Sequence, residues 1–332
     1  ILLHSISYCP PPENTTYYGS LETNIILFIV FMIGMLVTTF GNLIVIISII
    51  HFQQLHTPTN VLTLSMAIAD FLIGIFIMPV KLIQTMDKCW DLGVYTCMAS
   101  IFFYGAITAI SITHLIFLSV DRYYAVCYPL HYSTKITIKI ALVFAAVSWS
   151  FSIFITALLF YVQFTFVYRD KNVSVGISWF VTDLIVYIVD MLFNCLLPFS
   201  VMVTLYSKIL IVAIQHSTAL RNVGDEVWTV QKKKKKGLIE RQNKATITIG
   251  IVIGTFFSFV SQYYICALLS VFIIIPDLAL NIVQYFVLFN YALNPLIYGL
   301  FYPWFRKAFK FIITFKIFKP GSSLINLLSE NK

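Results

Sequence analysis

Two carboxylates interrupt apolar stretches of this 332-residue chain. Asp190 lies in the middle of residues 185–198, which read IVYIVDMLFNCLLP, and Asp70 lies within residues 60–83. An ionisable side chain inside a membrane helix is costly, so it marks a candidate functional site. A lone carboxylate in a low-dielectric interior tends to bind a proton, whereas a nearby cation restores its charged form. We therefore expect each carboxylate either to bind a cation or to join a hydrogen-bond network.

Polar residues of other apolar stretches are expected at about the depth of Asp70. They are Asn42, Ser111, Asn290 and Asn294. Such a set suits a small cation such as sodium, or a water network, in an otherwise dry core. The alternative is a purely structural network of hydrogen bonds between helices, and spacing does not separate the two. No other cofactor is expected.

The sequence does not indicate enzymatic chemistry. Its six cysteines show no metal-ligand spacing, and it contains no nucleophile–base pair and no Gly-rich phosphate loop. It also lacks the basic repeat with interleaved aromatic residues that would favour nucleic-acid binding. We therefore expect no catalytic residue, no metal site of that kind and no nucleic-acid partner.

The composition indicates a membrane protein. Hydrophobic residues make up 59% of the chain and charged residues only 11%, whereas a soluble domain has about 25% charged residues. A bilayer span needs about 20 mainly apolar residues. Seven such stretches occur, at about 25–50, 60–83, 96–124, 139–162, 179–207, 245–273 and 279–302. The expected fold is an all-α bundle of seven transmembrane helices.

The distribution of Lys and Arg predicts the orientation. With the N-terminus outside, 18 of the 22 basic residues fall on the inner side. The four outer ones are Lys81, Lys88, Arg169 and Lys171. Two glycosylation sequons, at Asn14 and Asn172, also fall outside. These patterns predict a plasma-membrane protein with an extracellular N-terminus and a cytoplasmic C-terminus.

The segments outside the spans are also predicted. Residues 1–24 form the extracellular N-terminus, 25–302 the transmembrane domain and 319–332 the cytoplasmic tail. Residues 303–318 have aromatic and aliphatic residues at helical spacing with basic residues between them, which predicts an amphipathic helix on the inner membrane surface. The inner loop at about 208–244 carries five consecutive lysines, for which we expect a flexible, solvated loop near anionic lipid or an acidic partner protein.

Two motifs carry a resemblance to a known family. Asp121-Arg122-Tyr123 ends the third span, and Asn294-Pro295-Leu-Ile-Tyr298 ends the seventh. This combination resembles the rhodopsin-like G-protein-coupled receptors. The resemblance implies that Arg122 is the switch facing the G protein and that Asp121 restrains it in the inactive state. It further implies that two tyrosines swing toward Arg122 on activation, namely Tyr206 and Tyr298.

Three segments resemble the trace amine-associated receptors more closely. They are residues 51–60 (HFQQLHTPTN), 119–127 (SVDRYYAVC) and 294–307 (NPLIYGLFYPWFRK). The resemblance implies an olfactory or neuromodulatory receptor for small, in some cases volatile, amines. It also implies coupling to a stimulatory or olfactory G protein and signalling through cyclic AMP.

The amine anchor departs from the usual pattern of this family. Receptors for amines hold the ligand ammonium with an aspartate in span three, and the matching residue here is Tyr104. Tyr104 lies eighteen residues before Arg122, and Asp190 lies eighteen residues before Lys208, which marks the inner end of span five. The two residues are therefore expected at similar height. One branch of the family, well represented in fishes, likewise carries its aspartate in span five, so we interpret Asp190 as the relocated anchor.

The remaining ligand-binding candidates are polar or aromatic residues at similar height. They are Tyr104, Gln262, Tyr263, Tyr264, Gln284, Tyr285 and Asp183. Tyr104 is expected to donate to the anchoring carboxylate, and Gln262 to face the ligand, the bundle interior or a neighbouring helix. Asp183 either joins Asp190 in binding the two ends of a diamine or is a solvated residue.

Other departures leave alternatives open. The tryptophan and proline that this family usually has in span six are replaced by Val260 and Gln262, and the second outer loop has no cysteine. A disulfide is expected between Cys97 and Cys9, with Cys89 able to replace either partner.

The alternatives in function are a same-fold receptor for a non-amine ligand, a receptor that has lost signalling and, more distantly, a transporter.

Overall fold

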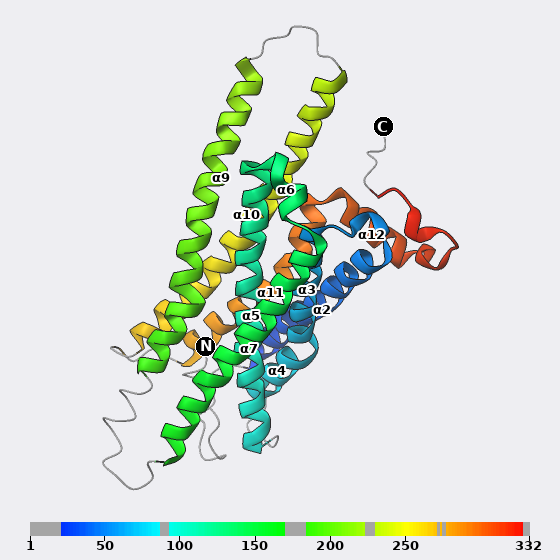
Figure 1. Ribbon diagram of the computed structural model, residues 1–332. Helices are drawn as coiled ribbons and strands as arrows, with labels where there is room; N and C mark the ends of the chain where they lie inside the picture. Colours follow the sequence, from blue (N-terminus) through cyan, green and yellow to red (C-terminus); the bar gives the residue numbers. More distant parts are fainter. Residues whose placement is uncertain are drawn as a thin grey trace.

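The computed structural model describes residues 21–86, 93–169, 184–222, 230–270, 273 and 277–327. All regular elements of this part of the chain are helices (Figure 1). They are α2 (Leu21–His51), η1 (Gln53–Leu55), α3 (Pro58–Leu72), η2 (Ile73–Ile77), α4 (Met78–Met86), α5 (Gly93–Cys127), α6 (Pro129–Lys135), α7 (Ile138–Arg169), a helix at residues 184–191, η3 (Leu192–Leu196), α9 (Leu197–Asn222), α10 (Val230–Leu269), α11 (Asp277–Phe301), α12 (Pro303–Ile313), η4 (Lys316–Phe318) and η5 (Ser322–Leu324).

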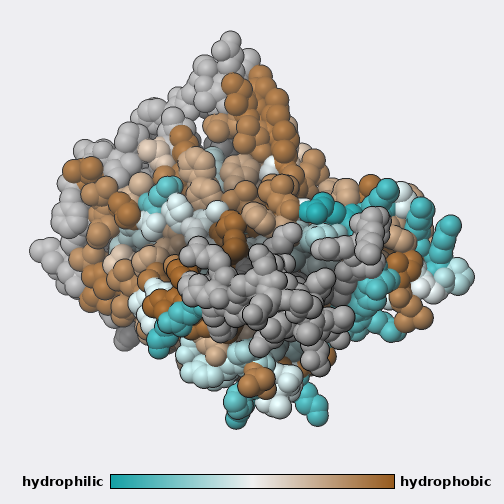
Figure 2. All heavy atoms as spheres, turned by 90° about the horizontal axis from the view of Figure 1, so that it is seen from above, coloured by the Kyte–Doolittle hydropathy of each residue, from teal (hydrophilic) through white to brown (hydrophobic). Residues whose placement is uncertain are grey.

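These helices form a seven-transmembrane bundle. Six helical segments within the described ranges are long and apolar enough to cross a bilayer: Ile25–His51, Pro58–Ile83, Tyr95–Cys127, Ile138–Val162, Leu184–Gln215 and Thr246–Leu269. Helix α11 supplies the seventh span. Hydrophobic side chains also cover much of the described outer surface (Figure 2), as expected where lipid replaces water as the solvent. The predicted fold class is therefore confirmed.

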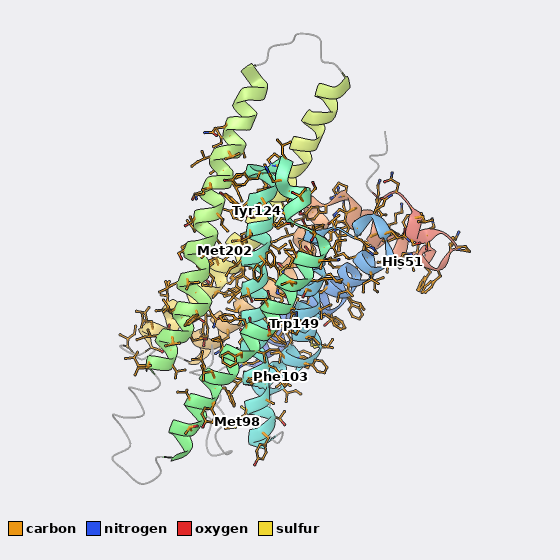
Figure 3. All side chains as sticks on the ribbon, in the orientation of Figure 1. His51, Met98, Phe103, Tyr124, Trp149 and Met202 are labelled. Carbon is orange, nitrogen blue, oxygen red and sulfur yellow. The ribbon has the colours of Figure 1, made fainter. Side chains whose placement is uncertain are left out.

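Helix α5 is the centre of the bundle. It packs against α3, α7, α9 and α10, while α2 packs against α3 and α11. The middle of α5 is therefore buried on all sides, as at Ile110, which is 1% exposed, whereas Phe103, two turns before it, is 53% exposed (Figure 3). The faces that the helices turn toward one another hold most of the candidate site residues.

Two π-helical segments lie close to the buried carboxylates. Segment η2 begins three residues after Asp70, and η3 begins two residues after Asp190. A proline stands two residues after the end of each segment, Pro79 after η2 and Pro198 after η3. Proline lacks the N–H that would bond one turn back, so the preceding turn widens. Such segments change the direction in which nearby side chains point.

The loop that we expected at about 208–244 is largely helical, so that prediction is wrong. Helix α9 continues to Asn222 and α10 begins at Val230, and both extend beyond the other helices in Figure 1. Lys232–Lys236 fall within α10. The physical reason is that Lys and Gln favour helix and that no proline interrupts these turns.

The chain after the seventh span folds back on the bundle. Helix α12 begins at Pro303 and buries Trp304, Phe305 and Ala308. Beyond it, Ser322 lies 2.9 Å from Nε2 of His51. The Leu327 backbone N–H donates to Gln54 at 3.1 Å. The described part of the predicted tail therefore packs against the segment that follows α2.

Candidate functional site

The Asp190 carboxylate is held by donors from two elements. Asp190 is 3% exposed. Asn194 Nδ2 donates to its Oδ1 at 2.8 Å, and the Tyr264 hydroxyl of α10 donates to its Oδ2 at 2.8 Å. Asn194 lies four residues after Asp190, which puts the two side chains on neighbouring turns. The carboxylate is therefore fixed in position on the interior side of residues 184–196.

The donor Tyr264 is itself positioned by a second tyrosine. The Tyr187 hydroxyl donates to the backbone carbonyl of Tyr264, and the two ring centroids lie 6.0 Å apart. Tyr187 precedes Asp190 by three residues, so both lie on the same helical face. Tyr263 packs edge-to-face on Tyr264 with centroids 5.6 Å apart. A cluster of buried tyrosines thus surrounds one oxygen of Asp190.

Tyr104 of α5 and Tyr291 of α11 are also buried in the interior of the bundle. Tyr104 is 7% exposed, and its backbone carbonyl accepts from the Thr108 hydroxyl at 2.7 Å. That hydroxyl lies 2.9 Å from the Tyr291 hydroxyl of α11. We expected Tyr104 to donate to Asp190; the tyrosine that the structure shows bonding to it is Tyr264. Sequence reasoning missed Asn194, although its i, i+4 spacing from Asp190 was a usable signal.

The other ligand-binding candidates divide between the interior and the outside. Gln284 of α11 is buried and accepts from Lys81 Nζ of α4 at 3.2 Å. Tyr285 is buried and packs edge-to-face on Phe31 with centroids 5.3 Å apart. Gln262, in contrast, is on the exposed side of α10, because the helix turns Tyr263 and Tyr264 inward. The expectation that Gln262 faces the interior is wrong, and Asp183 lies outside the described residues.

The network around Asp70 joins three helices. Its Oδ2 accepts from Asn294 Nδ2 at 2.7 Å, and its Oδ1 accepts a long bond from the Ser111 hydroxyl at 3.4 Å. Asn42 bonds instead to the Tyr291 carbonyl at 3.1 Å. Asn290 is 1% exposed, and neither its amide nitrogen nor its amide oxygen has a hydrogen-bond partner within the described residues.

Such orphaned polar atoms, one helical turn before Asn294, which bonds to Asp70, suit a water molecule or a small cation. The donor set is all oxygen and amide, which fits sodium and not a soft metal. Within the described residues, no three His, Cys, Asp or Glu side chains gather as a metal site.

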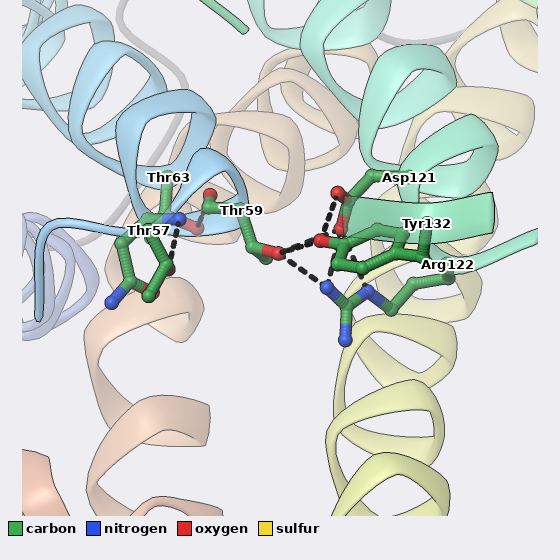
Figure 4. Close-up of polar contacts among 7 residues, drawn as sticks. Thr57, Thr59, Thr63, Asp121, Arg122 and Tyr132 are labelled. Atoms are coloured by element: carbon green, nitrogen blue, oxygen red, sulfur yellow. Dashed lines mark hydrogen bonds and ion pairs between the residues drawn. The ribbon is translucent and has the colours of Figure 1, made fainter. Parts of the chain in front are cut away.

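The Asp121–Arg122 cluster lies at the end of α5 that leads into α6, and Figure 4 shows its polar contacts. Arg122 Nε donates to Asp121 Oδ2 at 2.9 Å, and the guanidinium also bonds to Thr59. The Thr59 hydroxyl donates to Oδ2 of Asp121 at 2.7 Å, and the Tyr132 hydroxyl of α6 donates to Oδ1 at 2.8 Å. Burial, and then the charge of Asp121, raises the pKa of Tyr132 to about 12, so its hydroxyl keeps the proton that it donates.

The other predicted switch residues lie near this cluster or along α11. The Tyr206 hydroxyl is buried and has no hydrogen-bond partner within the described ranges. Tyr298 is 4% exposed and packs on Tyr302 with ring centroids 5.9 Å apart. Tyr123 is partly exposed and packs on its neighbours, and Pro295 lies inside α11. Sequence reasoning missed Thr59 and Tyr132, which come from other segments of the chain.

The predicted disulfide falls partly outside the described residues. Cys97 is 2% exposed and disulfide-bonded. Both candidate partners, Cys9 and Cys89, lie outside the described ranges, so the pairing stays a prediction. The sequons at Asn14 and Asn172 also lie outside them.

Comparison with known proteins identifies a family and several related receptors. Residues 41–298 match the family described as 7 transmembrane receptor (rhodopsin family). Trace amine-associated receptor 13c of Danio rerio is 36% identical, over 97% of this chain and 96% of its own length. Trace amine-associated receptor 6 of Homo sapiens is 36% identical over 93% and 91%, and trace amine-associated receptor 4 of Mus musculus 39% identical over 89% and 87%.

Proposed function

This chain belongs to the trace amine-associated receptors of the rhodopsin family of seven-transmembrane receptors, and we propose that Asp190 binds the ammonium group of its amine ligand. Membership makes it a multi-pass plasma-membrane receptor that binds a small ligand and couples to a G protein, and not an enzyme. The position of Asp190 carries the proposal. It is a buried carboxylate whose two oxygens are each oriented by a named donor.

The chemistry of Asp190 suits an ammonium. Asn194 and Tyr264 are neutral donors, so neither supplies a positive charge to the carboxylate. An arriving ammonium brings a positive charge to the carboxylate and forms charge-assisted hydrogen bonds, which are shorter and stronger than neutral ones. The buried rings of Tyr187, Tyr263 and Tyr264 add cation–π attraction of about 0.5–2 kcal/mol where the cation reaches a ring face.

Signalling follows from the opposite end of the bundle. Arg122, restrained by Asp121, Thr59 and Tyr132, acts as the switch that a stimulatory G protein of the olfactory type engages, so that the receptor raises cyclic AMP in response to odorous amines. The distribution of Lys and Arg supports an N-terminus outside and a C-terminus in the cytoplasm. A sodium ion or a water network at Asp70 and Asn290 accompanies the inactive state.

A signalling-impaired receptor is the second candidate. The replacement of the usual span-six tryptophan and proline by Val260 and Gln262 favours it, because a helix without proline lacks the usual cause of a kink. The bonded Asp121–Arg122 cluster favours a working switch. A cyclic AMP response to any amine would reject the impaired receptor.

The test is the substitution Asp190→Asn in cells that report cyclic AMP, with a panel of mono-, di- and polyamines. Truncating one partner of a buried charge pair costs about 2 kcal/mol or more, which is about 30-fold in affinity. We expect amine potency to fall by at least about that factor while surface expression is unchanged. The control is Gln262→Leu, on the exposed side of α10. An amine response that survives in Asp190→Asn would reject the anchor.

A further inference from the structure

The outer face of α10 carries a side-chain amide. Gln262 is exposed, whereas the next two residues, Tyr263 and Tyr264, are 4% and 2% exposed. Ser258 and Ile265 share the face of Gln262, at i−4 and i+3, and both are exposed. Gln262 therefore points away from the bundle, on the side of α10 that faces lipid.

Stacked aromatic rings border this outer face on both sides. Phe257 stacks on Phe199 of α9 with ring centroids 3.9 Å apart. Phe259 stacks on Phe286 of α11 with ring centroids 5.8 Å apart. Each contact ties α10 to one neighbouring helix. At about 100° per residue, Gln262 lies between the two contacts around the helix axis, so neither neighbour covers it.

The depth of Gln262 places it inside the hydrocarbon layer. The part of α10 that is long and apolar enough to cross a bilayer is Thr246–Leu269. At 1.5 Å per residue, Gln262 is about 10 Å from the Leu269 end and about 24 Å from the Thr246 end. The hydrocarbon core of a bilayer is about 30 Å thick. Water is absent at that depth, so a polar group there needs a partner from protein.

The amide of Gln262 has no hydrogen-bond partner in the part of the chain that the structure describes. Exposed hydroxyls of other spans are satisfied within their own helices. Ser150 donates to the Ala146 carbonyl at 2.8 Å, and Ser200 donates to the Leu197 carbonyl at 2.8 Å. An amide has both donors and an acceptor to satisfy, and leaving them unpaired in hydrocarbon is costly. Gln262 therefore indicates a partner outside this chain.

We propose that the outer face of α10 binds a second copy of this receptor, with the amides of the two Gln262 side chains bonded to each other. Copies in one membrane share one orientation, so a two-fold axis between two of them runs along the membrane normal. This axis sets the two α10 helices parallel and puts Gln262 opposite the partner's Gln262 at the same depth. Two carboxamides are complementary, because the NH2 group of each donates to the carbonyl of the other.

A second copy meets the needs of Gln262 better than lipid does. An acyl chain offers neither a donor nor an acceptor, whereas hydrogen bonds between Gln side chains stabilise helix pairs in membranes. The contact does not involve the amine site, since Tyr264, which bonds to Asp190, lies about 200° around the helix from Gln262. We therefore expect Gln262→Leu to leave amine potency and basal cyclic AMP unchanged.

The experiment uses purified receptor in phosphatidylcholine vesicles, so that no other protein is present. Receptors labelled with a donor dye are mixed with receptors labelled with an acceptor dye, and energy transfer is measured as lipid dilutes them. The unaltered receptor is expected to show transfer well above the level of random proximity. Gln262→Leu is expected to weaken the association about three- to thirtyfold. Gln262→Asn keeps an amide and is expected to weaken it less.

Two further variants and a mixed pair sharpen the test. Ser150→Leu is the matched control, because it replaces an exposed polar residue that is satisfied within its own helix; no change in association is expected. Ile265→Trp puts a large ring on the same face of α10 and is expected to weaken association without removing an amide. An unaltered receptor is expected to pair with Gln262→Leu no better than two Gln262→Leu copies pair, because one amide stays unbonded.

Three results would overturn the proposal. Energy transfer of the unaltered receptor at the random level would show that this face binds another membrane protein or none. Equal association of the unaltered receptor and Gln262→Leu would place the contact elsewhere on the surface. A mixed pair of intermediate affinity would show that the two Gln262 side chains do not bond to each other. If Gln262→Leu does not fold, Gln262→Asn and Ile265→Trp decide the matter, and normal association in both rejects the face.

Discussion

Asp121 and Asp190 are both buried carboxylates, but their surroundings differ. Asp121 is paired with the guanidinium of the next residue in the chain and also accepts from Thr59 and Tyr132. Asp190 accepts from Asn194 and Tyr264, which are neutral. Both carboxylates are oriented: a guanidinium is among the donors to Asp121, whereas Asn194 and Tyr264 at Asp190 are neutral.

The difference assigns the two ends of the bundle to two tasks. The Asp121–Arg122 pair is complete within the chain, so it opens only when a conformational change separates its members. Burying an ion pair is costly, and breaking it is costlier still because a charge is left unpaired. Asp190 instead accepts from two neutral donors that fix its geometry, an arrangement consistent with the ammonium binding proposed above. The first arrangement suits a switch, and the second suits a binding site.

Removing the charge of Asp121 is expected to have the largest effect. Asp121→Asn leaves Arg122 without its ion-pair partner, and breaking a buried pair costs about 3–5 kcal/mol. The inactive state loses most of that energy, which shifts the equilibrium by about 100-fold, so we expect ligand-independent cyclic AMP to approach the amine-stimulated maximum. The measurement is basal cyclic AMP at matched surface expression.

The control for this experiment is Gln262→Leu, a substitution on the exposed side of α10. No change in basal activity is expected for it. Basal activity that stays flat in Asp121→Asn, in a receptor that responds to amine, would show that Asp121 does not restrain the switch.

Removing one donor to Asp190 is expected to have an intermediate effect. Tyr264→Phe deletes the hydroxyl that bonds to Oδ2 and keeps the ring. Hydrogen bonds to charged groups contribute about 1.5–3 kcal/mol, which is roughly tenfold or more in amine affinity. The matched substitution Tyr161→Phe removes the hydroxyl of an exposed tyrosine of α7. Equal losses in the two variants, measured by ligand-induced thermal stabilisation, would contradict the assigned role of Tyr264.

The smallest effect is expected at Tyr132. Tyr132→Phe removes one neutral-donor bond to Asp121 and leaves the Arg122 and Thr59 contacts in place. A net contribution of about 0.5–1.5 kcal/mol predicts a rise in basal cyclic AMP of about two- to tenfold, below that of Asp121→Asn. The double variant Asp121→Asn with Tyr132→Phe tests the coupling, since Tyr132 should add nothing once Asp121 is changed.

The predicted and the missed residues differ in the information that is needed to identify them. The seven spans follow from apolar length, and the Asp121–Arg122–Tyr123 motif is contiguous, so both could be predicted from the sequence. Tyr264 reaches Asp190 from another helix, and only the rotation of α10 decides that Tyr264 faces inward and Gln262 outward. One residue changes the direction on a helix by about 100°, so an uncertain boundary erases the distinction.

Apolar length, the placement of basic residues and two contiguous motifs determined from the sequence alone that this is a seven-helix receptor with a carboxylate in its fifth span. These features are local or additive, so they need no knowledge of packing. The tertiary structure alone decided which groups meet: Tyr264 and Asn194 at Asp190, Thr59 and Tyr132 at Asp121, and Gln284 at Lys81. Except for Asn194 and Tyr132, these partners come from segments distant in the chain. Their contacts depend on the axial position and rotation of packed helices, which a largely apolar sequence specifies only through its complete packing.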